Sequence, residues 1–340
     1  MNYDVLKSKL KAMKSYLFTQ DDYVDLACSK NIKEIVNKLK NNTGYQEVIR
    51  EIDEKDVHRS DVERKLFLSL RNDFRKIYKF VFDFDIKKYL DAYFLKDEIY
   101  VLKLILCMIY DRKELKYNVS ELKYVIDNKL KIDIEKLRSS ENVDQFIFNL
   151  SGTEFFDFMR ESYDETKSLF ELEVKMDLYY YLKLDKIMNR CLSRKDKSIM
   201  QKVHGIEIDL INISWLYRIK KYYNIGAENM FCYLIPLAYK LKKDEIIKFA
   251  STKSLAELED MICHSVYGNL FMEKDFKIER VIYDYLLRIY RVMCLNNKNS
   301  IVSVVYYLYL KRLEINNITS IIEGVRYKLS KDEIISYIYV

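Results

Sequence analysis

The chain has 340 residues, of which 49% are hydrophobic, so it can bury the core of one large domain or of two to three small ones. Six glycines and one proline, Pro236, are too few for the turns of many short strands, which excludes an all-β fold and predicts long helices. The 58 basic and 52 acidic side chains give a net charge of +6 without a concentrated basic stripe, which argues against nucleic acid as the main partner.

The amino terminus, MNYDVLKSKLKAMKSYLF, lacks the apolar core of a signal peptide. The longest apolar stretches, near residues 99–110 and 301–310, are shorter than a membrane span. We therefore expect a cytoplasmic protein with no transmembrane segment of its own, which reaches a membrane only through a partner or a surface.

The first helix signature is the segment 26–39, LACSKNIKEIVNKL. Asn31 is followed three residues later by Glu34, the arrangement of a capping box at the start of a helix. The apolar residues of this segment fall three and four positions apart on one helical face, at Ile32, Ile35 and Leu39.

Two more features complete this first pattern. The pair Val62-Glu63 precedes Leu66 and opens a long amphipathic helix. Further on, an acidic residue, a tyrosine and an apolar pair follow one another at Asp97, Tyr100, Val101 and Leu104.

The three features then recur twice in the same order, with a period of about 110 residues. The capped segment returns as LRSSENVDQFIFNL (137–150) and FASTKSLAELEDMI (249–262). Its caps and their partners are Asn142 with Gln145 and Ser254 with Glu257, and its apolar faces are Val143, Phe146, Leu150 and Leu255, Leu258, Ile262. The opening pairs are Leu172-Glu173 and Ile278-Glu279, and the closing groups are Asp209, Asn212, Ile213, Leu216 and Glu314, Asn317, Ile318, Ile321.

A repeat of this length is longer than the two-helix units of ordinary solenoids, so each copy is predicted to be a small helical bundle. The copies are placed at residues 1–113, 114–223 and 224–340, with joints near Lys113 to Asn118 and Asn224 to Glu228. No Gly/Ser-rich or Pro-rich linker separates them, so we expect one continuous body with the bundles around an approximate threefold axis. Ser330 and Glu333 predict one more capped helix near the end.

The sequence contains no recognisable catalytic or cofactor-binding motif. The glycines are all isolated, so no phosphate-binding loop is present. His58, His204 and His264 lie in different copies, and none belongs to an HExxH motif. We predict no catalytic residue, no cofactor and no metal site.

The cysteines lie far apart, without a CxxC pair or a histidine at metal-ligand spacing, and are expected to be buried, reduced thiols. They are Cys28, Cys107, Cys191, Cys232, Cys263 and Cys294.

The recurring Glu63, Glu173 and Glu279 could form a threefold carboxylate site, but a glutamate in the first turn of a helix also complements the helix dipole, and we favour that role. Asn212 and Asn317, with their acidic neighbours, are likewise assigned to buried bonds that join helix ends across copies.

The basic run Arg190 to Lys202 could touch acidic lipid or nucleic acid, but we favour a solvated loop between two helices. Trp215 lies in an apolar helical stretch and is expected in the core or at an interface between copies.

With these repeats, the chain resembles the C-type subunit of the archaeal and bacterial V/A-type ATPases, the relative of the d-type subunit of the eukaryotic vacuolar ATPase. Three segments carry the resemblance: MKSYLFTQDDYVDLACSKNIKEIVNKLKNNTGY (13–45), YLIPLAYKLKKDEIIKFASTKSLAEL (233–258) and YLYLKRLEINNITSIIEGVRYKLSKDEII (307–335). The last is the most specific, because Glu314, Asn317 and Gly324 precede the capped helix at Ser330.

The resemblance implies three helical bundles arranged as a funnel, and a non-catalytic subunit that links the central shaft to the membrane rotor ring. Its implied partners are the central-shaft subunits, of D and F type, and the ring subunits, of c, K or L type, at the cytoplasmic face of the membrane. ATP and the transported proton or sodium ion would bind to other subunits. A free-standing helical adaptor is the alternative, and a nucleic-acid binder ranks third.

Overall fold

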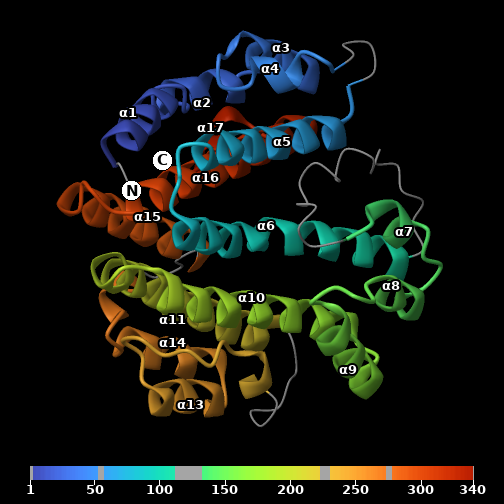
Figure 1. Ribbon diagram of the computed structural model, residues 1–340, viewed down its shortest axis with the longest axis vertical. Coiled ribbons are helices and arrows are strands. Elements are labelled where there is room, and N and C mark those ends of the chain that lie inside the picture. The colour runs from blue at the N-terminus through green and yellow to red at the C-terminus, as the bar shows by residue number, and fades with distance from the viewer. Residues whose placement is uncertain (1–2, 53–56, 112–131, 223–229, 273–277, 340) are drawn as a thin grey trace. The chain divides into compact units, whose positions relative to one another are not determined.

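The computed structural model describes residues 3–52, 57–111, 132–222, 230–272 and 278–339 (Figure 1). All regular secondary structure in these ranges is helical, which confirms the predicted all-α fold. Both predicted joints, near 113–118 and 224–228, lie outside the described residues, so the boundaries of the three copies stay a prediction.

The helices fall into three runs, each with short helices followed by two long ones. The first run contains α1 (Tyr3–Lys14), α2 (Gln20–Ala27), α3 (Ile32–Asn41), α4 (Gln46–Ile49), α5 (Arg59–Tyr78) and α6 (Phe84–Tyr110). The second contains α7 (Ile134–Arg138), α8 (Val143–Asn149), α9 (Phe156–Thr166), α10 (Leu169–Cys191) and α11 (Arg194–Tyr222). The third contains η3 (Phe231–Tyr233), α13 (Lys243–Ser251), α14 (Leu255–Cys263), η4 (Gly268–Leu270), α15 (Ile278–Asn296) and α16 (Val302–Arg326), followed by α17 (Lys331–Ser336).

The three sequence features occupy equivalent helices in these runs. The capped segments form α3, α8 and α14, the opening pairs lie in α5, α10 and α15, and the closing groups lie in α6, α11 and α16. The same features therefore recur on helices in the same order along the chain.

The caps of α3, α8 and α14 form as predicted, with one difference. The backbone N–H of the third helical residue donates to the cap side chain in each: Glu34 to Asn31 at 3.0 Å, Gln145 to Asn142 at 2.9 Å and Glu257 to Ser254 at 3.1 Å. The reciprocal bond reaches one residue further back than in a capping box, to the N–H of Lys30, Glu141 and Lys253. The predicted box at Ser330 and Glu333 forms completely and begins α17.

The chain divides into two compact units, each described by itself. The first unit comprises Met1–Lys87, Tyr100–Asp157 and Ser303–Val340, and the second comprises Lys88–Ile99 and Phe158–Val302. Helix α6 contributes its two ends to the first unit and its middle to the second.

In the first unit, α3 and α4 pack with one another and with α5, α1 packs on α5, and α17 packs on α2. Their shared core includes the fully buried Leu39, Tyr45 and Leu66, joined by Ile318 and Ile321 of α16. The apolar face predicted for 26–39 therefore faces this core.

In the second unit, α11 is the central helix. It packs along α15 and against α10 and α14, while α13 packs on α14 (Figure 1). Its residues Leu210, Ile213 and Leu216 are fully buried, and Trp215 is half-buried on the same helix. A helix surrounded in this way has little free surface, and its polar residues must therefore find partners inside the unit.

The loop predicted for the basic run Arg190 to Lys202 is wrong. The run is helical except at residues 192–193, because α10 continues to Cys191 and α11 begins at Arg194. Ser193 makes the short turn possible: its hydroxyl accepts the N–H of Asp196 at 3.2 Å, as a helix cap does.

The burial predicted for the cysteines is also wrong. All six are free thiols, but Cys28 and Cys232 are exposed and the other four are half-buried. Wide spacing of the cysteines in the sequence argues against disulfides and metal clusters, but it does not predict that a thiol is buried.

Candidate functional site

Asp209, the acidic residue of the second closing group, lies in α11 and accepts hydrogen bonds from residues outside that helix. Its carboxylate accepts the backbone N–H groups of Tyr239, Lys240 and Leu241 at 3.2, 2.8 and 3.1 Å, and the hydroxyl of Tyr267 at 2.8 Å. The side chain is fully buried. Burial raises the pKa of Asp209, although the four hydrogen bonds favour its charged form. Asp209 thereby holds the chain segment that leads into α13.

Asn212, one turn further along α11, holds the same segment at a second point. Its side-chain amide donates to the carbonyl of Ile235 at 3.0 Å, and its oxygen accepts the N–H of Ile235 at 2.9 Å. Asn212 is fully buried, so both of its polar groups are used. Asn212 therefore has the buried structural role predicted for it, with its partner in the loop between η3 and α13 rather than at a helix end.

Glu314 of α16 has the corresponding role in the first unit. It accepts the N–H of Phe18 and the hydroxyl of Tyr45, each at 2.5 Å. The buried ammonium of Lys311 also donates to it, at 2.8 Å, and lies 3.7 Å from the centre of the Tyr45 ring. Phe18 precedes α2 as Leu241 precedes α13, so the two carboxylates bind equivalent segments.

Asn317 differs from Asn212 in its partner. Its amide donates to the carbonyl of Tyr339 at 2.6 Å, and its oxygen accepts the N–H of Tyr339 at 3.0 Å. The segment after α17 thus occupies, in the first unit, the place that Ile235 occupies in the second. For Asn317, the predicted bond across copies is wrong, since both residues lie within the third predicted copy.

The first closing group departs from the other two. Asp97 is buried, whereas Tyr100 stands in the asparagine position and is 47% exposed. Its ring stacks on Phe67 of α5, with the ring centres 5.2 Å apart. Tyrosine has no side-chain amide that could pair with both the N–H and the carbonyl of one backbone residue, as asparagine does. The ring of Tyr100 makes an aromatic contact instead.

The recurring glutamates Glu63 and Glu279 have different partners. Glu63 pairs with Arg59 at 2.5 Å, and Arg59 also pairs with Glu323 of α16. Glu279 accepts from Arg218 of α11 at 2.9 Å. Only Glu279 lies in the first turn of its helix; α5 and α10 begin earlier than predicted, so Glu63 and Glu173 lie one turn further in. The ion pair of Glu279 joins α15 to α11, whereas the ion pair of Glu63 lies within α5 and it is Arg59 that reaches α16.

Only one histidine takes part in a buried network. His204 of α11 is 3% exposed, with Nε2 2.7 Å from the hydroxyl of Tyr89 and Nδ1 3.3 Å from Glu207. Glu207 also accepts from Lys96 at 3.4 Å. His58 precedes α5 and His264 follows α14, and both are exposed. The network was missed in the sequence, because its members come from α6 and α11.

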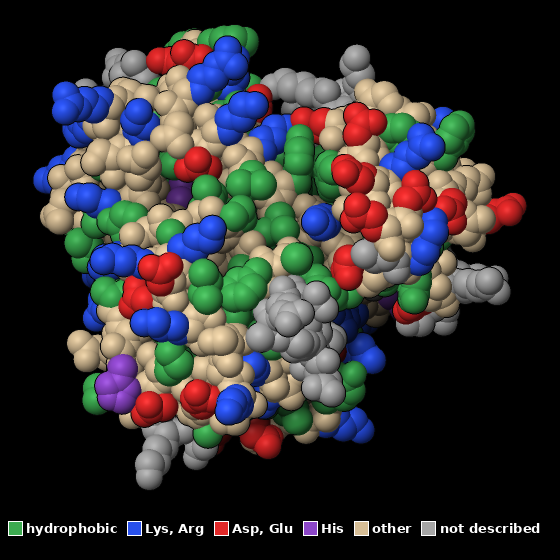
Figure 2. All heavy atoms as spheres, turned by 90° about the horizontal axis from the view of Figure 1, so that it is seen from below, with side chains coloured by type: hydrophobic (Ala, Val, Ile, Leu, Met, Phe, Trp, Pro, Cys, Tyr) green, Lys and Arg blue, Asp and Glu red, His purple; other side chains and the backbone are tan. Residues whose placement is uncertain are grey.

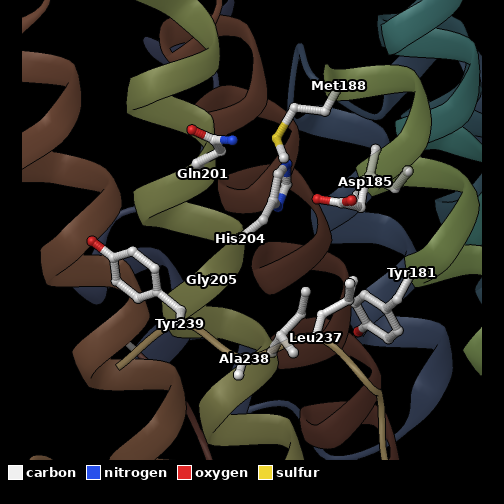
Figure 3. A pocket seen from close by; sticks show the side chains of 11 residues that line it. Tyr181, Asp185, Met188, Gln201, His204, Gly205, Leu237, Ala238 and Tyr239 are labelled. Atoms are coloured by element: carbon white, nitrogen blue, oxygen red, sulfur yellow. The ribbon is translucent and has the colours of Figure 1, made fainter. Parts of the chain in front are cut away.

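The second unit contains a pocket of about 240 Å³ beside this network (Figure 3). Its walls are mainly apolar, and its polar members include Asp185, Gln201 and His204. Both ring nitrogens of His204 already have partners, so the imidazole offers no free base to the pocket. Within the described residues, no group of three or more His, Cys, Asp or Glu side chains is placed to hold a metal ion.

The surface carries both signs of charge, interspersed with hydrophobic side chains, on the face seen in Figure 2. In the parts of the chain that the structure describes, no helix is both long and apolar enough to cross a membrane.

Comparison with known proteins agrees with this architecture. The sequence model of the ATP synthase (C/AC39) subunit family matches residues 6–337. The chain is also similar to the C-type subunit of the A-type ATP synthase of Methanosphaera stadtmanae, with 23% identity over 275 residues, which cover 79% of this chain and 67% of that protein. Because the family match includes the capped segments, the long helices and the bonding residues Asp209 and Glu314, the chain belongs to the ATP synthase (C/AC39) subunit family.

Proposed function

We propose that this protein is the central-stalk coupling subunit of a V/A-type rotary ATPase. In this role it links the central-shaft subunits, of D and F type, to the membrane rotor ring, of c, K or L type, at the cytoplasmic face. It is a non-catalytic subunit that transmits torque for ATP-driven proton or sodium transport or for ATP synthesis. The observation that carries the proposal is the family match over residues 6–337.

The use of polar residues supports a mechanical role. Asp209, Asn212, Glu314 and Asn317 are all buried, and each bonds a distant segment of backbone rather than facing an open cavity. Fully satisfied buried bonds make a structure stiff, which a subunit that transmits torque needs. We propose the same stiffness for the three bundles, at 1–113, 114–223 and 224–340, arranged as a funnel.

The test is reconstitution. The full chain is co-expressed with the shaft and ring subunits of its own organism, and the complex is isolated by size exclusion in mild detergent. We expect a stoichiometric assembly that bridges shaft and ring, and ATP-driven ion transport in vesicles that depends on this chain. Shaft and ring that form an ion-transporting complex without it would contradict the coupling role and favour a free-standing adaptor.

A further inference from the structure

We infer that one end of the second unit, where α10 turns into α11 and α15 turns toward α16, binds an anionic lipid surface. We call this end the basic corner. It consists of the cations Arg190, Arg194, Lys195, Lys197 and Lys298, together with the exposed Leu295. The inference does not rest on the coupling role, because it uses only the residues of this corner.

Asp196 joins the two turns that make the basic corner. Its carboxylate accepts the Ser300 hydroxyl at 2.5 Å and the Ile301 N–H at 3.0 Å, and the hydroxyl of Ser193 at 3.2 Å. Asp196 is 6% exposed, so its charge is directed into the unit. The acidic residue that lies among these cations in the sequence therefore serves the internal structure.

Few carboxylates lie near the cations of the corner in the sequence. Asp196 is the only acidic residue between Asp185 and Glu207, and none occurs between Asp284 and Glu314. Among the described residues, none of the five cations forms an ion pair or a side-chain hydrogen bond, and all except the half-buried Lys197 are exposed. Clustered charge of one sign creates a local potential that attracts anions.

Three of the cations lie at positions in a helix where positive charge is unfavourable. Arg194, Lys195 and Lys197 lie in the first turn of α11, where the helix dipole places positive partial charge. Acidic residues are preferred at such positions, so the local structure gains nothing from three cations. A local rule broken without an internal benefit is typical of a surface that serves an external partner.

The neighbouring apolar residues favour lipid over nucleic acid. Leu295 is 63% exposed and Val292 is 43% exposed, on the same face of α15. Exposed aliphatic side chains beside lysine and arginine are typical of surfaces that lie in the headgroup region of a membrane. Tyr290 is the only Phe, Tyr or Trp at 186–206 and 286–300, and it is buried, so the corner offers no stacking platform for bases.

The experiment measures partitioning of the full chain onto vesicles of phosphatidylcholine, with and without phosphatidylglycerol. The test variant is R194E/K195E/K197E. Its matched control is K243E/K248E/K253E, which makes the same charge change at three exposed positions of the same unit. We expect the test variant to lose at least about tenfold in partitioning to anionic vesicles, while the control changes little.

Two further measurements make the test specific. The melting temperature of R194E/K195E/K197E should be unchanged or raised, because glutamate suits the first turn of α11. The variant Leu295→Ser should weaken binding to anionic vesicles severalfold and leave binding to duplex DNA unchanged. These readouts separate lipid binding from assembly with shaft and ring, which is measured by size exclusion.

Three outcomes would overturn the inference. One is equal partitioning onto neutral and anionic vesicles. Another is an equal loss for test and control variants, which would show that only net charge matters. The third is tighter binding to duplex DNA than to anionic vesicles at equal phosphate, together with no effect of Leu295→Ser.

Discussion

Asp209 and Glu314 serve the same purpose with different neighbours. Glu314 has the ammonium of Lys311 at 2.8 Å, whereas Asp209 is held by three backbone N–H groups and a tyrosine hydroxyl. A buried carboxylate without a cation depends on its hydrogen bonds alone to remain charged. Burial raises the pKa of Asp209, and its hydrogen bonds to Tyr267 and to the backbone oppose that shift.

Glu207 provides a pH-dependent prediction. Burial opposes its ionisation, but Lys96 and His204 hold the pKa of Glu207 at about 2, below the ordinary value of 4.5. The charged form therefore stabilises the second unit above pH 4.5, and this contribution is lost as the pH falls from 4.5 toward 2. We expect Glu207→Gln to lower the free energy of unfolding at pH 7 by up to ~3 kcal/mol.

Urea denaturation at several pH values measures this effect. The difference between wild type and Glu207→Gln should narrow as the pH falls through that window. The exposed Glu161→Gln in the same unit serves as the control and should differ little from wild type at any pH. A difference for Glu207→Gln that is constant with pH would show that packing, rather than charge, is lost.

At the scale of elements, the loop before α13 approaches α11 closely because Gly205 has no side chain. A Cβ atom there would lie 2.5 Å from Cγ and 2.7 Å from Cβ of Tyr239. Tyr239 is also the first of the three residues whose N–H groups bind Asp209. The close approach and the hydrogen bonds thus depend on one another.

We expect Gly205→Ala to destabilise the second unit by about 1–3 kcal/mol, because the new methyl group displaces the Tyr239 backbone from Asp209. The measurement is thermal unfolding of Gly205→Ala, of Tyr239→Gly and of the double variant. The double variant should be more stable than Gly205→Ala alone, since removal of both Cβ and the ring of Tyr239 makes space for the methyl group. Additive losses would indicate that the two residues do not interact.

At the scale of the whole molecule, one run of helices supplies hydrogen-bonding partners to another run within the same unit. The third run supplies the segment held by Asp209 of the second, and the first run supplies Phe18 and Tyr45 to Glu314 of the third. Asn317 instead binds the segment after α17, which belongs to the same run as α16.

Paired variants test these contacts. Asn317→Leu leaves the N–H and carbonyl of Tyr339 without their partner, and it should increase hydrogen exchange in α17 and α2 while α11 stays protected. Asn212→Leu leaves the buried groups of Ile235 unpaired and should cost about 2–4 kcal/mol, with faster exchange at residues 234–241. Hydrogen exchange that rises equally in both regions for both variants would show that the two contacts are not independent.

Local determinants of this fold are predictable from the sequence. The caps at Asn31, Asn142 and Ser254 are recognisable because a cap and its partner are three residues apart. The same reasoning failed at Ser193, where a serine three residues before Asp196 is a cap signal that the surrounding charges obscured. It also placed Glu63 one turn too early, because α5 begins at Arg59.

The sequence by itself determined the all-helical class, the order of capped and long helices, their recurrence and the family, since each depends on residue types at short or regular spacing. Only the tertiary structure decided the partners of Asp209, Asn212, Glu314 and Asn317, the burial of each thiol and the network around Glu207. Tyr45 and Glu314 are 269 residues apart and meet through packing. Such partners depend on how helices pack, which residue periodicity does not specify.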